Sequence, residues 1–147
     1  MPYVRVWIHL IWSTKNREPL LQKELRSKLF DHIKSNAKDK GVYLDTIGGH
    51  IDHVHALISL RSDQTVAKVT QLLKGESSHW VNKESLTRTK FEWQDEYIAL
   101  SVSESAVEKV RGYVKGQEKN HRKKSFLEEY QEFLVQHGFS AEGLKSP

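Results

Sequence analysis

The stretch VYLDTIGGHIDHVHALISL, residues 42–60, decides the expected fold. Its first six residues predict a short strand, and residues 51–60 predict a second strand that is largely apolar. Gly48 and Gly49 lie between these two runs and predict a turn. We therefore expect a β-hairpin near the middle of the chain.

Regular elements are expected on the N-terminal side of this hairpin. Residues 3–12, YVRVWIHLIW, place apolar side chains at alternate positions and predict a strand. Residues 20–39 repeat leucine or isoleucine at four-residue spacing, which predicts an amphipathic helix. Gly41 follows that run and is expected to end the helix.

The C-terminal side continues the same alternation of strands and helices. Asp63 is the expected N-cap of a helix that runs to about residue 82, and residues 97–102, YIALSV, predict a fourth strand. The order β-α-β-β-α-β predicts an α+β, ferredoxin-like fold with an antiparallel sheet and helices packed on one face, plus C-terminal helices. We expect the other face of the sheet to be open.

Two more helices are expected after the fourth strand. Ser103 or Ser105 is expected to cap the first, and Ser105 with Glu108 makes a capping box for a helix that reaches about residue 119. Residues 126–137 have an amphipathic pattern and predict a short helix, whereas residues 140–147 predict a mobile tail.

Composition excludes several classes of protein. The chain has 147 residues and no cysteine, which excludes disulfides, thiolate metal sites and cysteine nucleophiles. No run approaches the roughly 20 apolar residues that span a bilayer. The N-terminus lacks the pattern of a secretory signal. We expect one domain without membrane contact and a cytoplasmic localisation.

The positive charge is concentrated in one segment. Residues 109–124 hold seven Lys or Arg and one Glu, whereas the whole chain has a formal net charge of only +4. A face that meets a polyanion explains this distribution, and so does a solvated, lysine-rich helix face. Charge alone leaves both interpretations open.

His53 and His55 are the first candidates for chemistry. Side chains alternate along a strand, so these two imidazoles share one face and can hold one metal ion, while Val54 points into the core. His50 is a possible supporting group or alternative ligand. Asp52 is expected to point away from the pair and is not a ligand. Two histidines on an ordinary solvated strand face are the alternative interpretation.

Tyr113 and Gln117 are the second pair of candidates. They lie four residues apart on an expected helix and share a face at the edge of its valine stripe. A tyrosine beside the core and a glutamine in solvent are the alternative interpretation. Combined with the histidines, the pair suggests a tyrosine that attacks a phosphodiester beside a divalent ion.

Four stretches together carry a resemblance to a known family: IHLIWSTKNREPLL, GGHIDHVHALISL, FEWQDEYIALSVS and VRGYVKGQEKNHRK. Over residues 5–124 the chain resembles the HUH-type single-tyrosine transposases of bacterial insertion sequences. The resemblance extends to their relatives associated with repetitive extragenic palindromes.

The resemblance implies roles for individual residues. Tyr113 corresponds to the nucleophile, and His53, His55 and Gln117 correspond to the metal ligands, with Mg²⁺ or Mn²⁺ as the cofactor. It implies binding of DNA hairpins at element ends and cleavage and rejoining of single-stranded DNA through a 5′-phosphotyrosine. It also implies a homodimer whose active site is completed in trans.

The resemblance and the charge pattern also predict the domain boundary and the residues that contact DNA. Residues 1–125 are expected to form the catalytic domain, and residues 126–147 a C-terminal helix and tail of the same domain. The basic side chains proposed as phosphate contacts are Lys109, Arg111, Lys115 and Lys119.

Three alternatives remain at this stage. One is a non-catalytic nucleic-acid-binding module, since Arg111-Gly112-Tyr113 matches the start of an RNA-binding signature. Another is a metal-dependent hydrolase or metal sensor that uses His50, His53 and His55. The third is a domesticated relative of the transposases that acts on chromosomal palindromes.

Overall fold

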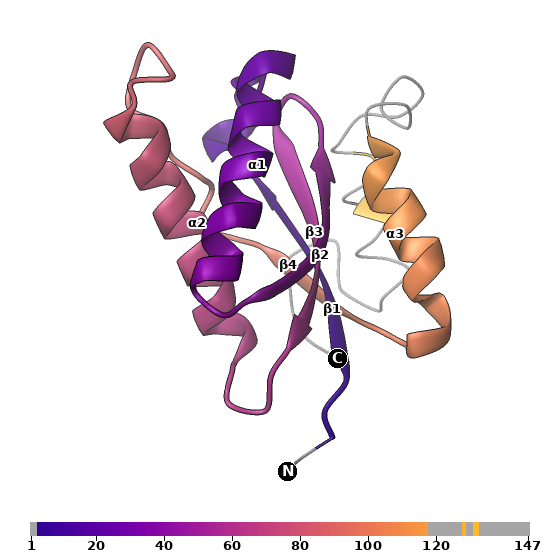
Figure 1. Ribbon diagram of the computed structural model, residues 1–147. Helices are drawn as coiled ribbons and strands as arrows, with labels where there is room; N and C mark the ends of the chain where they lie inside the picture. The colour runs from indigo at the N-terminus through magenta and orange to yellow at the C-terminus, as the bar shows by residue number, and fades with distance from the viewer. Residues whose placement is uncertain (1–2, 118–127, 129–130, 133–147) are drawn as a thin grey trace. The chain divides into compact units, whose positions relative to one another are not determined.

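The computed structural model describes residues 3–117 together with 128, 131 and 132 (Figure 1). The chain divides into two compact units, residues 1–117 and 118–147. In the second unit the described residues, Glu128, Gln131 and Glu132, are helical. The expected end of a helix at 119, most of the expected helix at 126–137 and the expected tail at 140–147 lie outside the described residues.

The first unit is built on a four-stranded antiparallel sheet. Its order is β2-β3-β1-β4, as in a ferredoxin-like fold. The α+β fold class is thereby confirmed. The strands are β1 (Val6–Ser13), β2 (Tyr43–Gly49), β3 (His53–Leu60) and β4 (Ile98–Val102), and the helices are α1 (Lys23–Asp39), α2 (Val66–Lys83) and α3 (Val107–Lys115).

The two faces of the sheet carry different helices. Figure 1 shows α1 and α2 on one side of the sheet and α3 on the other. The main core lies under α1 and α2 and contains alternate residues of the central strands, Leu10 and Trp12 from β1 and Val54 and Ala56 from β3. The second face is not open as expected, because α3 covers it and packs Val107 against Trp7 and Leu57.

The glycine pair is not the hairpin turn. Gly48 and Gly49 are the last residues of β2, and the connection to β3 is formed by residues 50–52. Neither glycine has a positive φ. A Cβ on Gly48 would lie 2.0 Å from the carbonyl oxygen of Val114, and one on Gly49 would lie 2.2 Å from that of His53. Glycine is required at both positions because another stretch of backbone lies too close for a side chain. The expected turn was inferred from the turn propensity of glycine alone.

The residue expected at a helix end is confirmed in one case and wrong in two. Gly41 ends α1 as expected, with φ 74° and a 2.8 Å bond from the Val42 N–H to the Ala37 carbonyl. Thr65, and not Asp63, caps α2 through its hydroxyl. The expected serine capping of α3 is wrong, because a 3-10 turn over Glu104–Ala106 leads directly into the helix.

None of the helices in the described part of the chain is long and apolar enough to cross a membrane.

Candidate active site

The two histidines of β3 face α3. They alternate with Val54, which lies in the main core, so they project from the opposite face of the sheet. Both side chains are completely buried. The ring centroids of His53 and His55 are 5.1 Å apart. The interpretation as two histidines on a solvated strand face is therefore wrong.

Gln117 reaches this pair from the end of α3. Its side chain is completely buried, although a glutamine in solvent was one of the two interpretations of the sequence. Its Nε2 donates to the backbone carbonyl of Tyr113 at 3.2 Å, which turns Oε1 toward Nε2 of His53, 3.1 Å away. Gln117 and His53 are thus brought together although 64 residues separate them.

Tyr113 lies on α3, four residues before Gln117, which follows the end of the helix. Its ring packs edge-on against His55, with centroids 5.6 Å apart, and against His9, with centroids 6.1 Å apart. The structure therefore brings together all four residues that the sequence analysis assigned to catalysis and metal binding, within one chain.

The surroundings of His53 indicate what the site can hold. Its Nδ1 lies 2.8 Å from a carboxylate oxygen of Asp52, and its Nε2 faces the amide oxygen of Gln117. Both partners are acceptors, whereas a neutral imidazole has one N–H. With the proton on Nδ1, the Nε2 lone pair and the Gln117 oxygen converge, as two ligands of one cation do.

The observed spacing supports this interpretation. Adjacent ligands of an octahedral ion with bonds of about 2.1 Å lie about 3.0 Å apart, and the Nε2-to-Oε1 distance is 3.1 Å. Among the described residues, no group of three or more His, Asp or Glu side chains is placed to hold a metal ion. An ion bound between His53 and His55 would need a ligand of another type, and Gln117 is placed to supply it.

Two residues of this site were missed by sequence reasoning. Asp52 was expected to point away from the pair, but β3 starts at His53, so strand alternation does not apply to Asp52. His9 was placed only in the alternating pattern of the first strand, yet its Nε2 lies 2.8 Å from Nδ1 of His55. Strand pairing of β1 with β3 creates this contact, and no local sequence pattern reports it.

Comparison with known proteins identifies the family. Residues 3–117 match the family model described as "Transposase IS200 like". This match covers the whole sheet, α3 and the candidate site. The chain belongs to the IS200-like transposase family.

Individual relatives agree with this assignment. The transposase is 30% identical over 115 residues to the ISDra2 transposase TnpA of Deinococcus radiodurans, which covers 74% of this chain and 81% of that protein. A crystal structure described as a candidate transposase from Deinococcus radiodurans R1 superimposes with a TM-score of 0.65 at 26% identity, covering 80% of this chain and 95% of that one.

A third comparison concerns the fold alone. The structure of a REP-associated tyrosine transposase bound to a REP hairpin has a TM-score of 0.58 at 13% identity. It covers 95% of this chain and 73% of that chain. The arrangement of sheet and helices in this IS200-like transposase is therefore shared with a protein that binds a DNA hairpin.

An ion pair holds the tyrosine helix of the transposase against β2. Arg111 donates from Nε and Nη2 to the two carboxylate oxygens of Asp45, at 2.8 and 3.0 Å. The Asp45 side chain is only 10% exposed. These hydrogen bonds hold the pKa of the Asp45 carboxyl below its ordinary value, although partial burial opposes the shift.

Because of this ion pair, we expect the free energy of unfolding to depend on pH. A carboxyl with a lowered pKa in the folded state stabilises the fold above its unfolded pKa, and that contribution is lost as the pH falls through the folded pKa. Asp45→Asn should lower the free energy of unfolding by about 1–3 kcal/mol at pH 7. The difference from wild type should shrink below about pH 4, as measured by urea denaturation.

Asp63→Asn is the matched control, because Asp63 pairs with Arg61 at 3.9 Å on the surface. Such exposed pairs contribute little to stability. Equal effects of the two substitutions at pH 7 would contradict a special role for the Asp45–Arg111 pair.

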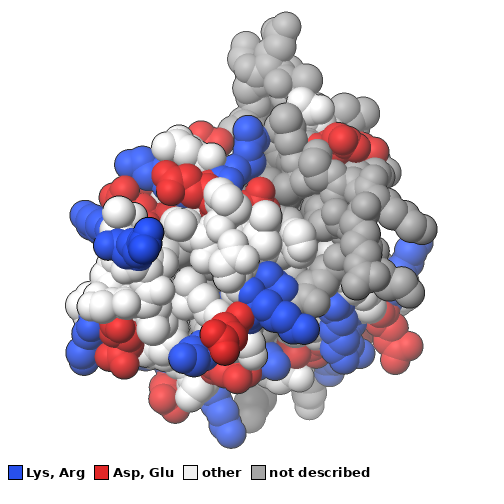
Figure 2. All heavy atoms as spheres, turned by 90° about the horizontal axis from the view of Figure 1, so that it is seen from above, with Lys and Arg blue, Asp and Glu red and all other residues white. Residues whose placement is uncertain are grey.

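The basic residues proposed as phosphate contacts of the transposase differ in exposure and in their ion pairing. Lys109 and Lys115 are exposed on α3, whereas Arg111 is engaged with Asp45. Lys119 lies outside the described residues. Figure 2 shows the end of the molecule where α3 finishes, and on its described part Lys and Arg are interspersed with Asp and Glu. The described residues do not form one continuous basic field on that face.

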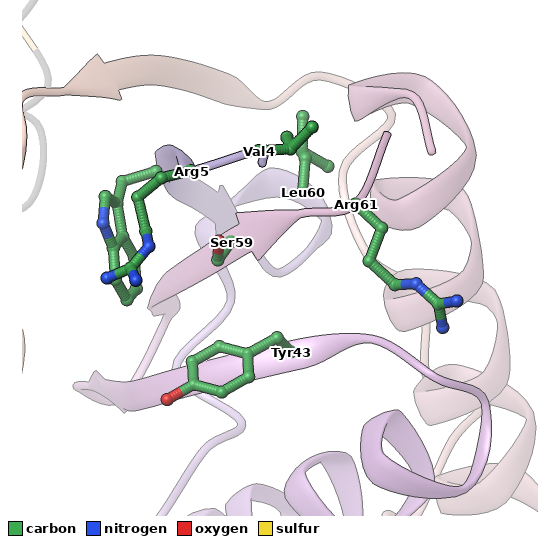
Figure 3. Close-up of a pocket in the computed structure, with 7 residues that line it drawn as sticks. Val4, Arg5, Tyr43, Ser59, Leu60 and Arg61 are labelled. Atoms are coloured by element: carbon green, nitrogen blue, oxygen red, sulfur yellow. The ribbon is translucent and has the colours of Figure 1, made fainter. Parts of the chain in front are cut away.

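A cavity of about 350 Å³ lies at the other end of the central strands. Figure 3 shows Tyr43 of β2 beside its register partner Ser59 of β3, with Arg5 and Arg61 at the margin. Arg5 is paired with Glu104 at 3.0 Å. Leu60, which lines the cavity, lies seven residues along β3 from His53, about 23 Å at the usual rise per residue. The cavity is therefore separate from the histidine site of the transposase.

Proposed function

We propose that this chain binds DNA hairpins and cleaves and rejoins single-stranded DNA through a 5′-phosphotyrosine intermediate with a divalent metal ion. Membership of a transposase family implies DNA cleavage and strand transfer. The observation that carries the finer proposal is the assembly of Tyr113 from α3, and Gln117 just after α3, beside His53 and His55 of β3.

Tyr113 is the nucleophile in this proposal. Its hydroxyl oxygen forms a bond to the scissile phosphorus, and the bond from phosphorus to the 3′ oxygen breaks. The tyrosine proton passes to solvent, and the leaving oxygen takes up a proton to give a free 3′-OH. Rejoining is the reverse reaction, in which a 3′-OH attacks the phosphotyrosine and releases the tyrosine.

His53, His55 and Gln117 would hold the divalent ion. When bound, it polarises the scissile phosphate and stabilises the charge that develops there. Two imidazole nitrogens and one amide oxygen suit Mn²⁺ as well as Mg²⁺, because imidazole is a softer ligand than the oxygens that Mg²⁺ prefers. The proposal therefore includes either ion.

A DNA hairpin is the proposed partner of this chain. A structural neighbour with the same fold is a REP-associated tyrosine transposase bound to a REP hairpin. Lys109 and Lys115 are exposed on α3, the helix that carries Tyr113, and exposed lysines can neutralise phosphates without reading sequence. An RNA-binding signature around Tyr113 would require a strand, whereas these residues are helical.

Two further points concern assembly and biological role. A homodimer whose active site is completed in trans remains a prediction, whereas the contact between Gln117 and His53 of the same chain supports a site formed within one chain. A domesticated relative that acts on chromosomal palindromes would use the same chemistry. The sequences that flank the gene distinguish it from a mobile element.

The test is cleavage of labelled single-stranded DNA that carries the hairpin from the gene's own flanks. With Mg²⁺ or Mn²⁺ we expect a covalent protein–DNA adduct that survives denaturation, and with EDTA none. His53→Ala should lower the rate of adduct formation by about 10²-fold or more, because the ion loses a ligand.

His79→Ala is the matched control, since His79 is exposed on α2. It should cleave like the wild type. Adduct formation that persists in EDTA would refute the metal-dependent mechanism, and hairpin binding without any adduct would favour a non-catalytic binding protein.

A further inference from the structure

His9 contacts two of the residues proposed for the reaction. It belongs to β1 and is buried, with 4% of the residue exposed, on the face of the sheet that α3 covers. Its Nε2 lies 2.8 Å from Nδ1 of His55, and its ring packs edge-on against Tyr113. No sequence motif of the site includes His9, and the contact arises from strand pairing.

The hydrogen bond between these imidazoles has two possible directions. If His9 donates, His55 accepts at Nδ1 and carries its own proton on Nε2. If His9 accepts, His55 carries its proton on Nδ1 and has a lone pair on Nε2. Only the second arrangement allows Nε2 of a neutral His55 to bind a cation, because Nδ1 is already engaged with His9.

His53, the neighbouring proposed ligand, is also held at its Nδ1 by a hydrogen-bond acceptor. Nδ1 of His53 faces the Asp52 carboxylate at 2.8 Å, which fixes the proton of that ring on Nδ1 and leaves Nε2 toward Gln117. Metal-binding histidines commonly donate their second ring N–H to a protein acceptor, which orients the ring and selects the tautomer. At His53 the acceptor is a carboxylate, and at His55 it is a second imidazole.

We propose that His9 is a positioning residue that accepts the Nδ1–H of His55 and thereby presents Nε2 of His55 to the divalent ion. The inference rests on the proposed metal site and assigns it a supporting residue. A neutral acceptor suits this place, because His9, His55 and His53 are all buried and a second carboxylate there would add a buried charge.

Binding of Mn²⁺ alone, measured by calorimetry without DNA, tests the proposal. His9→Phe keeps a ring of similar size but removes the acceptor, and we expect its Mn²⁺ affinity to fall about 10–100-fold. His9→Gln places an amide oxygen near the position of Nε2 and should recover most of the affinity. Wild-type affinity in His9→Phe, or equal losses in both variants, would overturn the proposal.

The tautomer of His55 in the wild-type protein provides a second, independent readout. Long-range ¹H–¹⁵N correlation spectra distinguish a proton on Nδ1 from one on Nε2, and His55→Ala identifies the signal. We expect the proton on Nδ1 in metal-free wild type. A proton on Nε2 of His55 in the wild type would overturn the proposal, however the His9 variants behave.

The two levels of inference fail in different ways. If His55→Ala binds Mn²⁺ as the wild type does, the proposed metal site is wrong, and the role of His9 in presenting His55 to the ion is wrong with it. If His55→Ala loses the ion while His9→Phe keeps it, the metal site stands and the role of His9 is wrong.

Discussion

Tyr113→Phe should bind the hairpin with wild-type affinity and form no covalent adduct with DNA. The substitution removes only the hydroxyl, while the ring keeps its edge-on contacts with His55 and His9. Loss of a nucleophile lowers the rate by about 10⁴-fold or more in enzymes that act through covalent intermediates. Electrophoretic mobility and denaturing gels with labelled DNA separate binding from cleavage.

Tyr97→Phe is the control for this prediction. Tyr97 is 39% exposed, lies outside the site and has Lys74 over its ring. It should form the adduct at the wild-type rate. Mass spectrometry of the wild-type adduct should locate the phosphodiester on the peptide that contains Tyr113. An adduct in Tyr113→Phe, or one attached to another residue, would show that the nucleophile is wrongly assigned.

Gly48→Ala should abolish activity by displacing α3, although Gly48 itself belongs to β2. A Cβ at this position would lie 2.0 Å from the carbonyl oxygen of Val114 and 3.0 Å from its carbon. Both atoms belong to the backbone of α3, so no side-chain rotation relieves the contact. Tyr113 precedes Val114 on that helix and Gln117 follows the end of the helix, so both must move with it.

The expected cost is about 1–3 kcal/mol of folding free energy, as for other overpacked contacts. We also expect loss of Mn²⁺ binding and of adduct formation. Circular dichroism should remain close to wild type, because the main core under α1 and α2 does not include Gly48. Urea denaturation, calorimetry and the cleavage assay measure the three effects.

Gly75→Ala is the matched control for Gly48→Ala. Gly75 lies inside α2, and a Cβ there would meet nothing within 4 Å. This substitution should stabilise the protein by up to about 1 kcal/mol, because alanine favours helix more than glycine does. Wild-type stability and cleavage in Gly48→Ala would show that α3 does not pack this closely on β2.

Local pattern predicted the elements and failed at several of their boundaries. Apolar periodicity placed four strands and three helices in the correct order, because burial of one face requires it. The failures, at Gly48, Asp63 and Ser105, share a cause. Each assignment used the residue's own propensity for turns or caps. The outcome was decided by a tertiary contact at Gly48, by the hydroxyl of Thr65 at the start of α2, and by a backbone bond in the 3-10 turn before α3.

Local spacing predicted the candidate site as two separate pairs, and only the resemblance to a known family joined them into one site. Strand alternation relates His53 to His55, and helical spacing relates Tyr113 to Gln117, so each pair could be found from neighbouring residues alone. Whether the pairs meet depends on the placement of α3 against the sheet. The bond between Gln117 and His53 spans 64 residues and has no local signature.

The sequence by itself determined the order of the elements, the fold class and the two pairs of candidate residues, since all of these depend on periodicities of two to four residues. Tertiary structure alone decided that α3 covers the second face, that Gly48 serves close packing, and that Asp52 and His9 support the two histidines. The physical reason is that these features arise from the packing of α3, from the pairing of β1 with β3 and from the position at which β3 begins.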